Sequence, residues 1–268
     1  MTKIRTFDGV ELAYTIDNHT DSWAQPDSVL CIHGFCENME AWQAWVPYFS
    51  RKYRMIRFDQ RGFGASSPIT ESFAYTTDVF ARDLVSVIDQ IAQCQVHVIA
   101  GKSGAISAIH LAGTRPDLVK TLTLVCSGLW PPKAPGRVEY MEQHGVRAWA
   151  HSTMRARVGT AMPQPGVEWW ADMMGGTSLT TARAYMRWIG EVDLEADLKR
   201  IACPAIVITT KLTDRAQAGT TLHDRIRHSE LAVMDVDGYN AYAADPDGCA
   251  GVALDFLSRH RGVKGVTC

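Results

Sequence analysis

The sequence has no excess charge of either sign and no long hydrophobic run. Its 268 residues include 27 Lys and Arg and 29 Asp and Glu, which gives a formal net charge of −2. Without a basic excess, a nucleic-acid partner is not expected. The longest apolar runs, residues 95–100 and 205–209, are far too short to span a bilayer, and residues 1–10 do not resemble a secretory leader. We therefore expect a cytoplasmic protein without a membrane partner.

The seven cysteines lack the spacing of a metal site. Their number is odd, and they are scattered without CxxC or CxxH pairs. Cys31, Cys94, Cys126 and Cys203 lie in or beside apolar runs, where a thiol behaves as a small core residue. We infer a reducing compartment, no structural zinc, and no metal or organic cofactor. The sequence leaves open whether the chain forms a homodimer.

Short apolar runs alternate with helical patterns along most of the chain. Residues 3–16 alternate polar and apolar around an Asp-Gly turn, which predicts a hairpin. The runs rich in Val, Ile and Leu predict strands buried on both faces, at 28–32, 53–58, 95–100, 121–126, 205–209 and 231–234. Apolar residues at helical spacing predict helices at 77–92, 104–113 and 247–259. This alternation indicates an α/β fold with a doubly wound, mostly parallel sheet.

One long segment interrupts the alternation. Between the runs at 121–126 and 205–209 there is no convincing strand, and the segment is rich in Trp, Met and Arg. We interpret residues 130–198 as an inserted helical cap. Residues 1–129 and 199–268 then form the core.

A glycine-rich turn follows the strand predicted at 95–100. Residues 101–105 read Gly-Lys-Ser-Gly-Ala, which matches a G-x-S-x-G nucleophile elbow with Ala in the last place. In this interpretation the strained residue is Ser103, and the small residues two places before and after it relieve crowding. The alternative is a phosphate-binding loop, but that motif needs a Gly separated by four residues from its final Gly-Lys, and residues 95–100 contain none.

Two further loops accompany the elbow. Residues 33–36 read His-Gly-Phe-Cys after a predicted strand, and residues 59–66 read Asp-Gln-Arg-Gly-Phe-Gly-Ala-Ser. In this order the three motifs resemble the α/β-hydrolase family, whose members include esterases, lactonases and C–C bond hydrolases. The resemblance covers both core segments and not the cap. It implies hydrolysis of an ester, lactone or vinylogous ketone by Ser103.

The resemblance also assigns the surrounding residues. The N–H groups of Phe35 and Gly104 would hold the oxyanion, each contributing roughly 3 kcal/mol to lowering the barrier. His33 borders the substrate site and is expected to shape its loop by hydrogen bonding, without acting as the base. Asp59 and Arg61 are expected to pin the loop that contains them.

The remainder of the expected triad is incomplete. Asp214 matches the family's acid, although a helix N-cap would explain it as well. The family's histidine follows a Gly and lies seven residues before a Pro; that position here is Tyr239, and no histidine lies between His228 and His260. A tyrosine with a pKa near 10 is a poor base at neutral pH. Lys102 is expected to be solvated or ion-paired, because the residue before an elbow serine points away from it.

Three accounts of Tyr239 stay open. It replaces the histidine in an inactivated variant, it belongs to an enzyme with altered chemistry, or the chain is a ligand-binding protein on a hydrolase scaffold. A cofactor-free lyase or oxygenase is a further possibility that this fold hosts.

The cap offers aromatic and basic side chains to a substrate. Trp130, Trp149, Trp170 and Trp188 are candidates for the walls of the pocket, although core packing explains each of them as well. Four arginines are candidates for clamping a carboxylate, namely Arg155, Arg157, Arg183 and Arg187. Together they suggest an aromatic, acidic substrate of the kind met in ring degradation.

Overall fold

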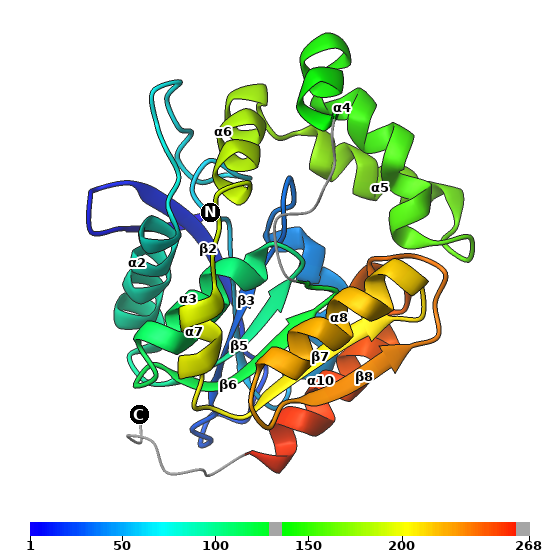
Figure 1. Ribbon diagram of the computed structural model, residues 1–268. Helices are drawn as coiled ribbons and strands as arrows, with labels where there is room; N and C mark the ends of the chain where they lie inside the picture. The colour runs from blue at the N-terminus through cyan, green and yellow to red at the C-terminus, as the bar shows by residue number, and fades with distance from the viewer. Residues whose placement is uncertain (129–135, 261–268) are drawn as a thin grey trace.

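A computed structural model describes residues 1–128 and 136–260. Its centre is an eight-stranded sheet in the order β1-β2-β4-β3-β5-β6-β7-β8 (Figure 1). The strands are β1 (Thr2–Arg5), β2 (Glu11–Asp17), β3 (Ser28–Ile32), β4 (Arg54–Phe58), β5 (Val96–Gly101), β6 (Val119–Val125), β7 (Ala205–Thr210) and β8 (Glu230–Met234). The β1–β2 hairpin pairs antiparallel with β4, and from β4 to β8 all neighbours are parallel. The predicted hairpin and fold class are confirmed.

Helices cover both faces of the sheet. In Figure 1, α3, α7 and α8 lie in front of the strands and α10 lies behind them. The core helices are η1 (Met39–Trp45), α1 (Val46–Phe49), α2 (Thr77–Val87) with its π-helical end η2 (Ile88–Ala92), α3 (Gly104–Thr114), α7 (Glu195–Arg200), α8 (Thr213–Arg225), α9 (Ala241–Ala244) and α10 (Pro246–Arg259). Because both faces are covered, β3, β5 and β7 are buried along their whole length, which explains their continuous apolar sequence.

Three helices stand above the carboxyl ends of the central strands (Figure 1). They are α4 (Arg137–Val158), which is kinked at Gly145, α5 (Gln164–Gly175) and α6 (Leu179–Ile189). Helix α4 packs against both α5 and α6. The expected end of the cap at residue 198 falls inside α7, which packs on α3 of the core. The helices above the sheet therefore end at Ile189.

A buried ion-pair network ties the loop after β4 to the core. The Arg61 guanidinium lies 2.8 Å from the Asp8 carboxylate and 2.6 Å from that of Asp83, and its side chain is 1% exposed. The Asp59 carboxylate accepts the backbone N–H groups of Met39 and Ala65, both at 2.7 Å. The structural roles expected for Arg61 and Asp59 are confirmed by these contacts.

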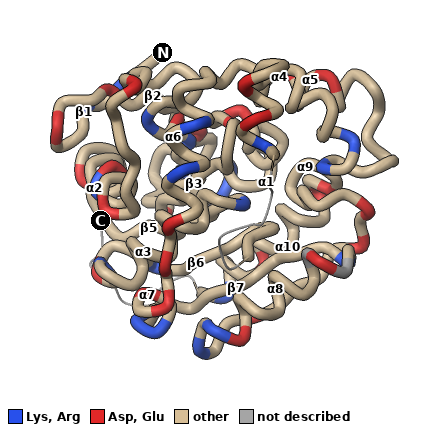
Figure 2. Tube along the Cα trace, turned by 45° about the horizontal axis from the view of Figure 1, so that its top comes forward, with Lys and Arg blue, Asp and Glu red and all other residues tan. Residues whose placement is uncertain are grey.

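The distribution of charged residues and the length of the described helices are consistent with the balanced charge and the short apolar runs of the sequence. Acidic and basic residues are interspersed over the chain (Figure 2). Within the described ranges, every helix is too short or too polar to cross a membrane.

We predict that Arg61→Met strongly destabilises the fold. The substitution leaves the Asp83 carboxylate buried without its cation, so the free energy of unfolding should fall by about 3–5 kcal/mol. Arg115→Met is the matched control, because it breaks the exposed pair with Asp117 and should cost less than about 1 kcal/mol. Urea unfolding measures both variants, and equal losses would contradict the structural role of Arg61.

Candidate active site

The chain turns from β5 into α3 at Lys102. Strand β5 ends at Gly101, Lys102 has a φ of +50°, and Ser103 is already helical with φ −72° and ψ −14°. In a nucleophile elbow the strained residue of this turn carries the reacting group. The expectation that Ser103 has the strained backbone is therefore wrong, and Lys102 stands at the apex. The small residues that the turn requires, two places before and after the apex, are Ala100 and Gly104.

Close packing of the backbone explains the need for Gly104. A Cβ atom at this position would lie 2.5 Å from the carbonyl oxygen of His33 and 2.9 Å from that of Ile32. Real Cβ atoms do not approach backbone oxygens so closely, so only glycine fits where α3 meets the end of β3.

Ser103 is buried and surrounded by hydrogen-bond donors. Its Oγ accepts the N–H of Phe35 and the hydroxyl of Tyr185 from α6, both at 2.9 Å. Burial raises the pKa of the Tyr185 hydroxyl well above its ordinary value, so this group stays protonated. Within the described part of the chain, no hydrogen bond joins Ser103 Oγ to a basic side chain. Both hydrogen bonds that the described residues make to Ser103 Oγ thus come from groups that donate to it.

The placement of the apex also changes the expected oxyanion donors. In an elbow one donor is the N–H of the residue after the apex, which is Ser103 and not Gly104. The second is the N–H of Phe35, as expected, but the Oγ of Ser103 occupies it. An internal hydroxyl therefore lies on the donor that a substrate oxygen would use.

Lys102 belongs to a buried polar cluster that the sequence patterns did not reveal. Its Nζ lies 2.6 Å from Glu37 Oε1, and the Glu37 side chain is fully buried. Glu37 Oε2 accepts the Tyr242 hydroxyl at 2.6 Å and the Gly34 N–H at 2.8 Å. Lys102 was expected to be solvated or ion-paired, and the ion pair is confirmed. We call Lys102, Glu37 and Tyr242 the elbow cluster.

Burial and the ion pair set the charges of the elbow cluster. Burial raises the pKa of the Glu37 carboxyl, but the Lys102 ammonium and the hydrogen bonds from Tyr242 and Gly34 outweigh this, so the pKa lies below its usual value. Burial lowers the pKa of Lys102, opposed by Glu37. The pKa of Tyr242 is raised well above its ordinary value by burial and by Glu37. The cluster therefore holds an ammonium whose proton is easier to remove than usual, a carboxylate and a neutral phenol.

His33 holds the loop that follows β3 through both of its ring nitrogens. It is fully buried, its Nε2 accepts the N–H of Gln60 at 3.0 Å, and its Nδ1 lies 2.9 Å from the carbonyl oxygen of Gly34. Both ring nitrogens are thus engaged with backbone groups, and burial lowers the pKa of the imidazole. The expected loop-shaping role is confirmed by these hydrogen bonds.

Hydrogen bonds among the described residues do not link the expected triad residues to one another. Asp214 lies in the first turn of α8 with an exposed side chain, and among the described residues no hydrogen bond joins it to Ser103 or Tyr239. Tyr239 is half-buried, its N–H lies 3.4 Å from the Ala156 carbonyl oxygen, and its ring lies 5.4 Å from the Arg157 guanidinium.

The cap tryptophans of the described residues contact different parts of the core. Trp149 packs against Phe35 with ring centroids 5.5 Å apart, and Trp170 faces the Tyr242 ring at 6.1 Å. Trp188 packs on Phe80 and donates to the Thr77 hydroxyl, so it serves the contact between cap and core. Trp130 lies outside the described residues.

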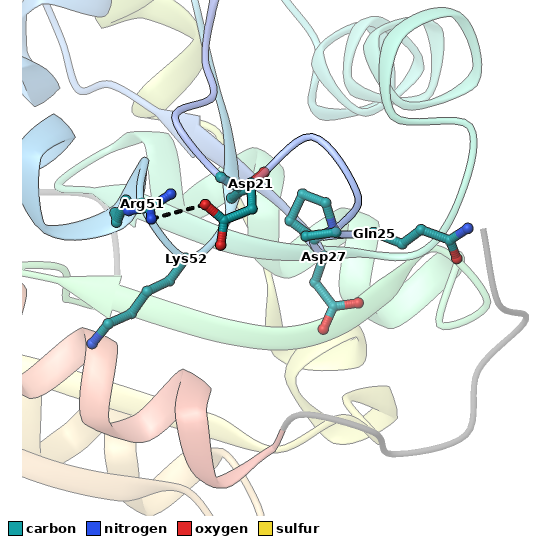
Figure 3. Close-up of a pocket in the computed structure, with 8 residues that line it drawn as sticks. Asp21, Gln25, Asp27, Arg51 and Lys52 are labelled. Atoms are coloured by element: carbon teal, nitrogen blue, oxygen red, sulfur yellow. Dashed lines mark ion pairs between the residues drawn. The ribbon is translucent and has the colours of Figure 1, made fainter.

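Cavities lined by described residues include two at the edge of the core. One of about 340 Å³ lies beside Tyr242, between η1, α5 and the start of α10, and includes Met162, Trp169 and Trp170 in its lining. The other, of about 370 Å³, is drawn in Figure 3. Its residues Asp21, Gln25 and Asp27 precede β3, so it opens at the amino ends of the strands and away from the elbow.

Comparisons with known proteins agree with this architecture. A family model described as alpha/beta hydrolase fold matches residues 27–180. Epoxide hydrolase 1 of Siraitia grosvenorii is 36% identical over 108 residues, which are 40% of this chain and 34% of that relative. The match thus spans about a third of the epoxide hydrolase. A probable esterase of Oryza sativa subsp. japonica is 23% identical over 87% of this chain and 90% of its own.

Solved structures share the fold over nearly the whole chain. The enol-lactonase from Burkholderia xenovorans LB400 superposes with a TM-score of 0.85 at 18% identity, covering 96% of this chain and all of its own. A hydrolase from Pseudomonas aeruginosa PA01 gives 0.84 at 24% identity, covering 96% and 97%. At such identities the likeness shows the fold alone.

We predict a strong energetic coupling between Glu37 and Lys102. Glu37→Gln leaves a buried ammonium unpaired and should lower the free energy of unfolding by about 3–5 kcal/mol at neutral pH, as should Lys102→Met. The double variant should lose much less than the sum, because neither charge is then left alone. Urea unfolding of all four proteins measures the coupling, and additive losses would show that the two groups do not interact.

The same pair predicts the acid side of the stability profile. The pKa of Glu37 is lower in the folded chain than in the unfolded one. Its contribution to stability is therefore present above the unfolded pKa and is lost as the pH falls through the folded pKa. Unfolding measured from neutral to acid pH should show a shallower decline for Glu37→Gln than for the unmodified chain, and parallel profiles would contradict this assignment.

Proposed function

We propose a carbonyl chemistry for this chain, which belongs to the alpha/beta hydrolase fold family. In this proposal the site acts on the carbonyl carbon of a small aldehyde or ketone, and Lys102 attacks this carbon in place of a serine. The observation that carries the proposal is the position of Lys102 at the apex of the elbow, with its ammonium 2.6 Å from a buried carboxylate. An amine becomes a nucleophile when it is desolvated and a neighbouring group takes its proton.

The proposed reaction forms an imine between Lys102 and the substrate. Glu37 accepts one proton from the ammonium, and the free amine attacks the carbonyl carbon to form a carbinolamine. The carbinolamine then loses its oxygen as water, and an iminium remains on Lys102. The two hydrogens of this water come from the Lys102 nitrogen, one of them by way of Glu37, so atoms and charge balance. The iminium withdraws electrons from the adjacent carbon, which favours proton abstraction or cleavage of a C–C bond there.

The neighbouring polar groups suit this reaction. Ser103 Oγ already accepts two hydrogen bonds, which leaves its own hydrogen to donate to the substrate oxygen. Tyr242 keeps the Glu37 carboxylate in place through its hydroxyl. Preorganised donors of this kind favour the developing negative charge on oxygen. In this proposal Ser103 polarises the carbonyl and does not attack it.

Serine hydrolysis of an ester, lactone or vinylogous ketone is the second candidate. The names of the relatives and structural neighbours, which include an esterase and an enol-lactonase, favour it. It requires a base for Ser103, and neither Asp214 nor Tyr239 is hydrogen-bonded to it among the described residues. The third candidate, a ligand-binding protein, is supported by the ion pair that already satisfies Lys102 and Glu37.

A fluorophosphonate probe separates the first two candidates. We expect no adduct in the intact mass, because no described basic side chain is hydrogen-bonded to Ser103. Ser103→Ala is the control. A stoichiometric adduct that disappears in Ser103→Ala would overturn the proposal and restore the serine mechanism.

A small β-diketone tests the amine directly. Pentane-2,4-dione should add to Lys102 with loss of one water, which peptide mass mapping locates. Lys120 is the matched control lysine, because its side chain is also 11% exposed and paired with a carboxylate, Asp27, at 2.8 Å. Lys102→Arg keeps a positive charge for Glu37 but should abolish the adduct. Equal modification of Lys102 and Lys120, or none at Lys102, would favour the binding protein.

A further inference from the structure

The structure distinguishes one cap arginine from the other three candidates. Arg183 is paired with Glu142 and Glu71, and Arg187 is exposed. Arg155 donates to the carbonyl oxygens that follow α4. Arg157, in contrast, is only 7% exposed, although it belongs to the same helix as Arg155.

Arg157 is a buried cation that forms no ion pair with the described residues. Its guanidinium lies over the rings of Trp149 at 4.7 Å and Tyr239 at 5.4 Å, and its Nε donates to the Thr153 hydroxyl at 3.2 Å. No carboxylate of the described residues lies within ion-pair distance of it. Ring faces and one hydroxyl offset only part of the cost of burying a guanidinium.

Arg157 lies beside the elbow cluster. Trp149 links its guanidinium to Phe35, the residue whose N–H binds Ser103. Its positive charge is also one of the influences that lower the pKa of Lys102 and oppose the rise in the pKa of Tyr242. Lys102 and Arg157 together carry two positive charges, and Glu37 carries one negative charge. Arg137 also lies over the Trp149 ring, at 5.9 Å, so positive charge prevails in this region.

We propose that Arg157 binds a carboxylate of the substrate, so that the compound handled at Lys102 is an oxo acid. The carboxylate binding itself stands on Arg157 alone, whereas the oxo group rests on the proposed function of Lys102. The planar guanidinium, which contacts two aromatic rings, offers the fork of donors that carboxylates accept. A substrate carboxylate would supply Arg157 with the anion that the described residues do not place within ion-pair distance of it.

Benzoate and benzamide test the carboxylate site without involving the amine. The two compounds have similar shapes and differ in charge. Neither a carboxylate nor an amide forms an imine with lysine. Isothermal titration should show benzoate binding to the full chain at least ten-fold more tightly than benzamide. Arg157→Gln should lose this difference, Arg157→Lys should keep part of it, and Arg187→Gln, which removes an exposed charge from the cap, should bind as the unmodified chain does.

The outcomes separate this inference from the proposed function. Equal affinities for benzoate and benzamide, no benzoate binding at millimolar concentration, or unchanged binding in a folded Arg157→Gln would each overturn the carboxylate site. The second measurement is trapping of pyruvate on Lys102 with cyanoborohydride, where Arg157→Gln should raise the half-saturating concentration at least ten-fold and Arg187→Gln should leave it unchanged. Benzoate binding through Arg157 without trapping at Lys102 keeps the carboxylate site and rejects the lysine chemistry. Trapping of pyruvate at Lys102 that is unchanged in Arg157→Gln keeps the lysine chemistry and rejects the carboxylate site.

Discussion

The buried ion pair between Lys102 and Glu37 is the contact around which the site is organised. Lys102 comes from the turn after β5, Glu37 from the loop after β3, and Tyr242 of α9 joins them through its hydroxyl. Three segments that are distant in sequence therefore meet at one carboxylate. Because an unpaired charge in this place is costly, the pair fixes the loops that surround any ligand and at the same time leaves a proton acceptor beside an amine.

The position of Lys102 at the apex distinguishes this turn from one that presents a serine. With Lys102 at the apex, Ser103 lies directly before the first residue of α3. Its hydroxyl oxygen accepts hydrogen bonds from the Phe35 N–H and the Tyr185 hydroxyl. Tyr185 reaches this point from the cap, so α6 completes the polar surroundings of the elbow. Arg157, from α4, adds a charge that nothing described balances. The cap thus contributes both shape and electrostatics to the site.

Much of the fold could be predicted from the sequence, because buried parallel strands are continuous apolar runs and the helices between them keep a helical period. The sequence prediction placed the apex of the elbow one residue too late. Residues 100–104 and residues 101–105 both have small residues two places on either side of their central residue. Only the positive φ of Lys102 shows that the first of these two segments is the elbow. Glu37 was missed because its partners lie 65 and 205 residues away. A charged residue directly after the His-Gly-Phe-Cys loop was the one available signal.

The most direct test of this account is a crystal structure of the protein treated with pyruvate and cyanoborohydride. We predict continuous density from Lys102 Nζ to the second carbon of the ligand, with the ligand carboxylate on Arg157 and Ser103 unmodified. Ligand density bonded to Ser103 Oγ, or an unmodified Lys102 with its side chain outside the site, would contradict it.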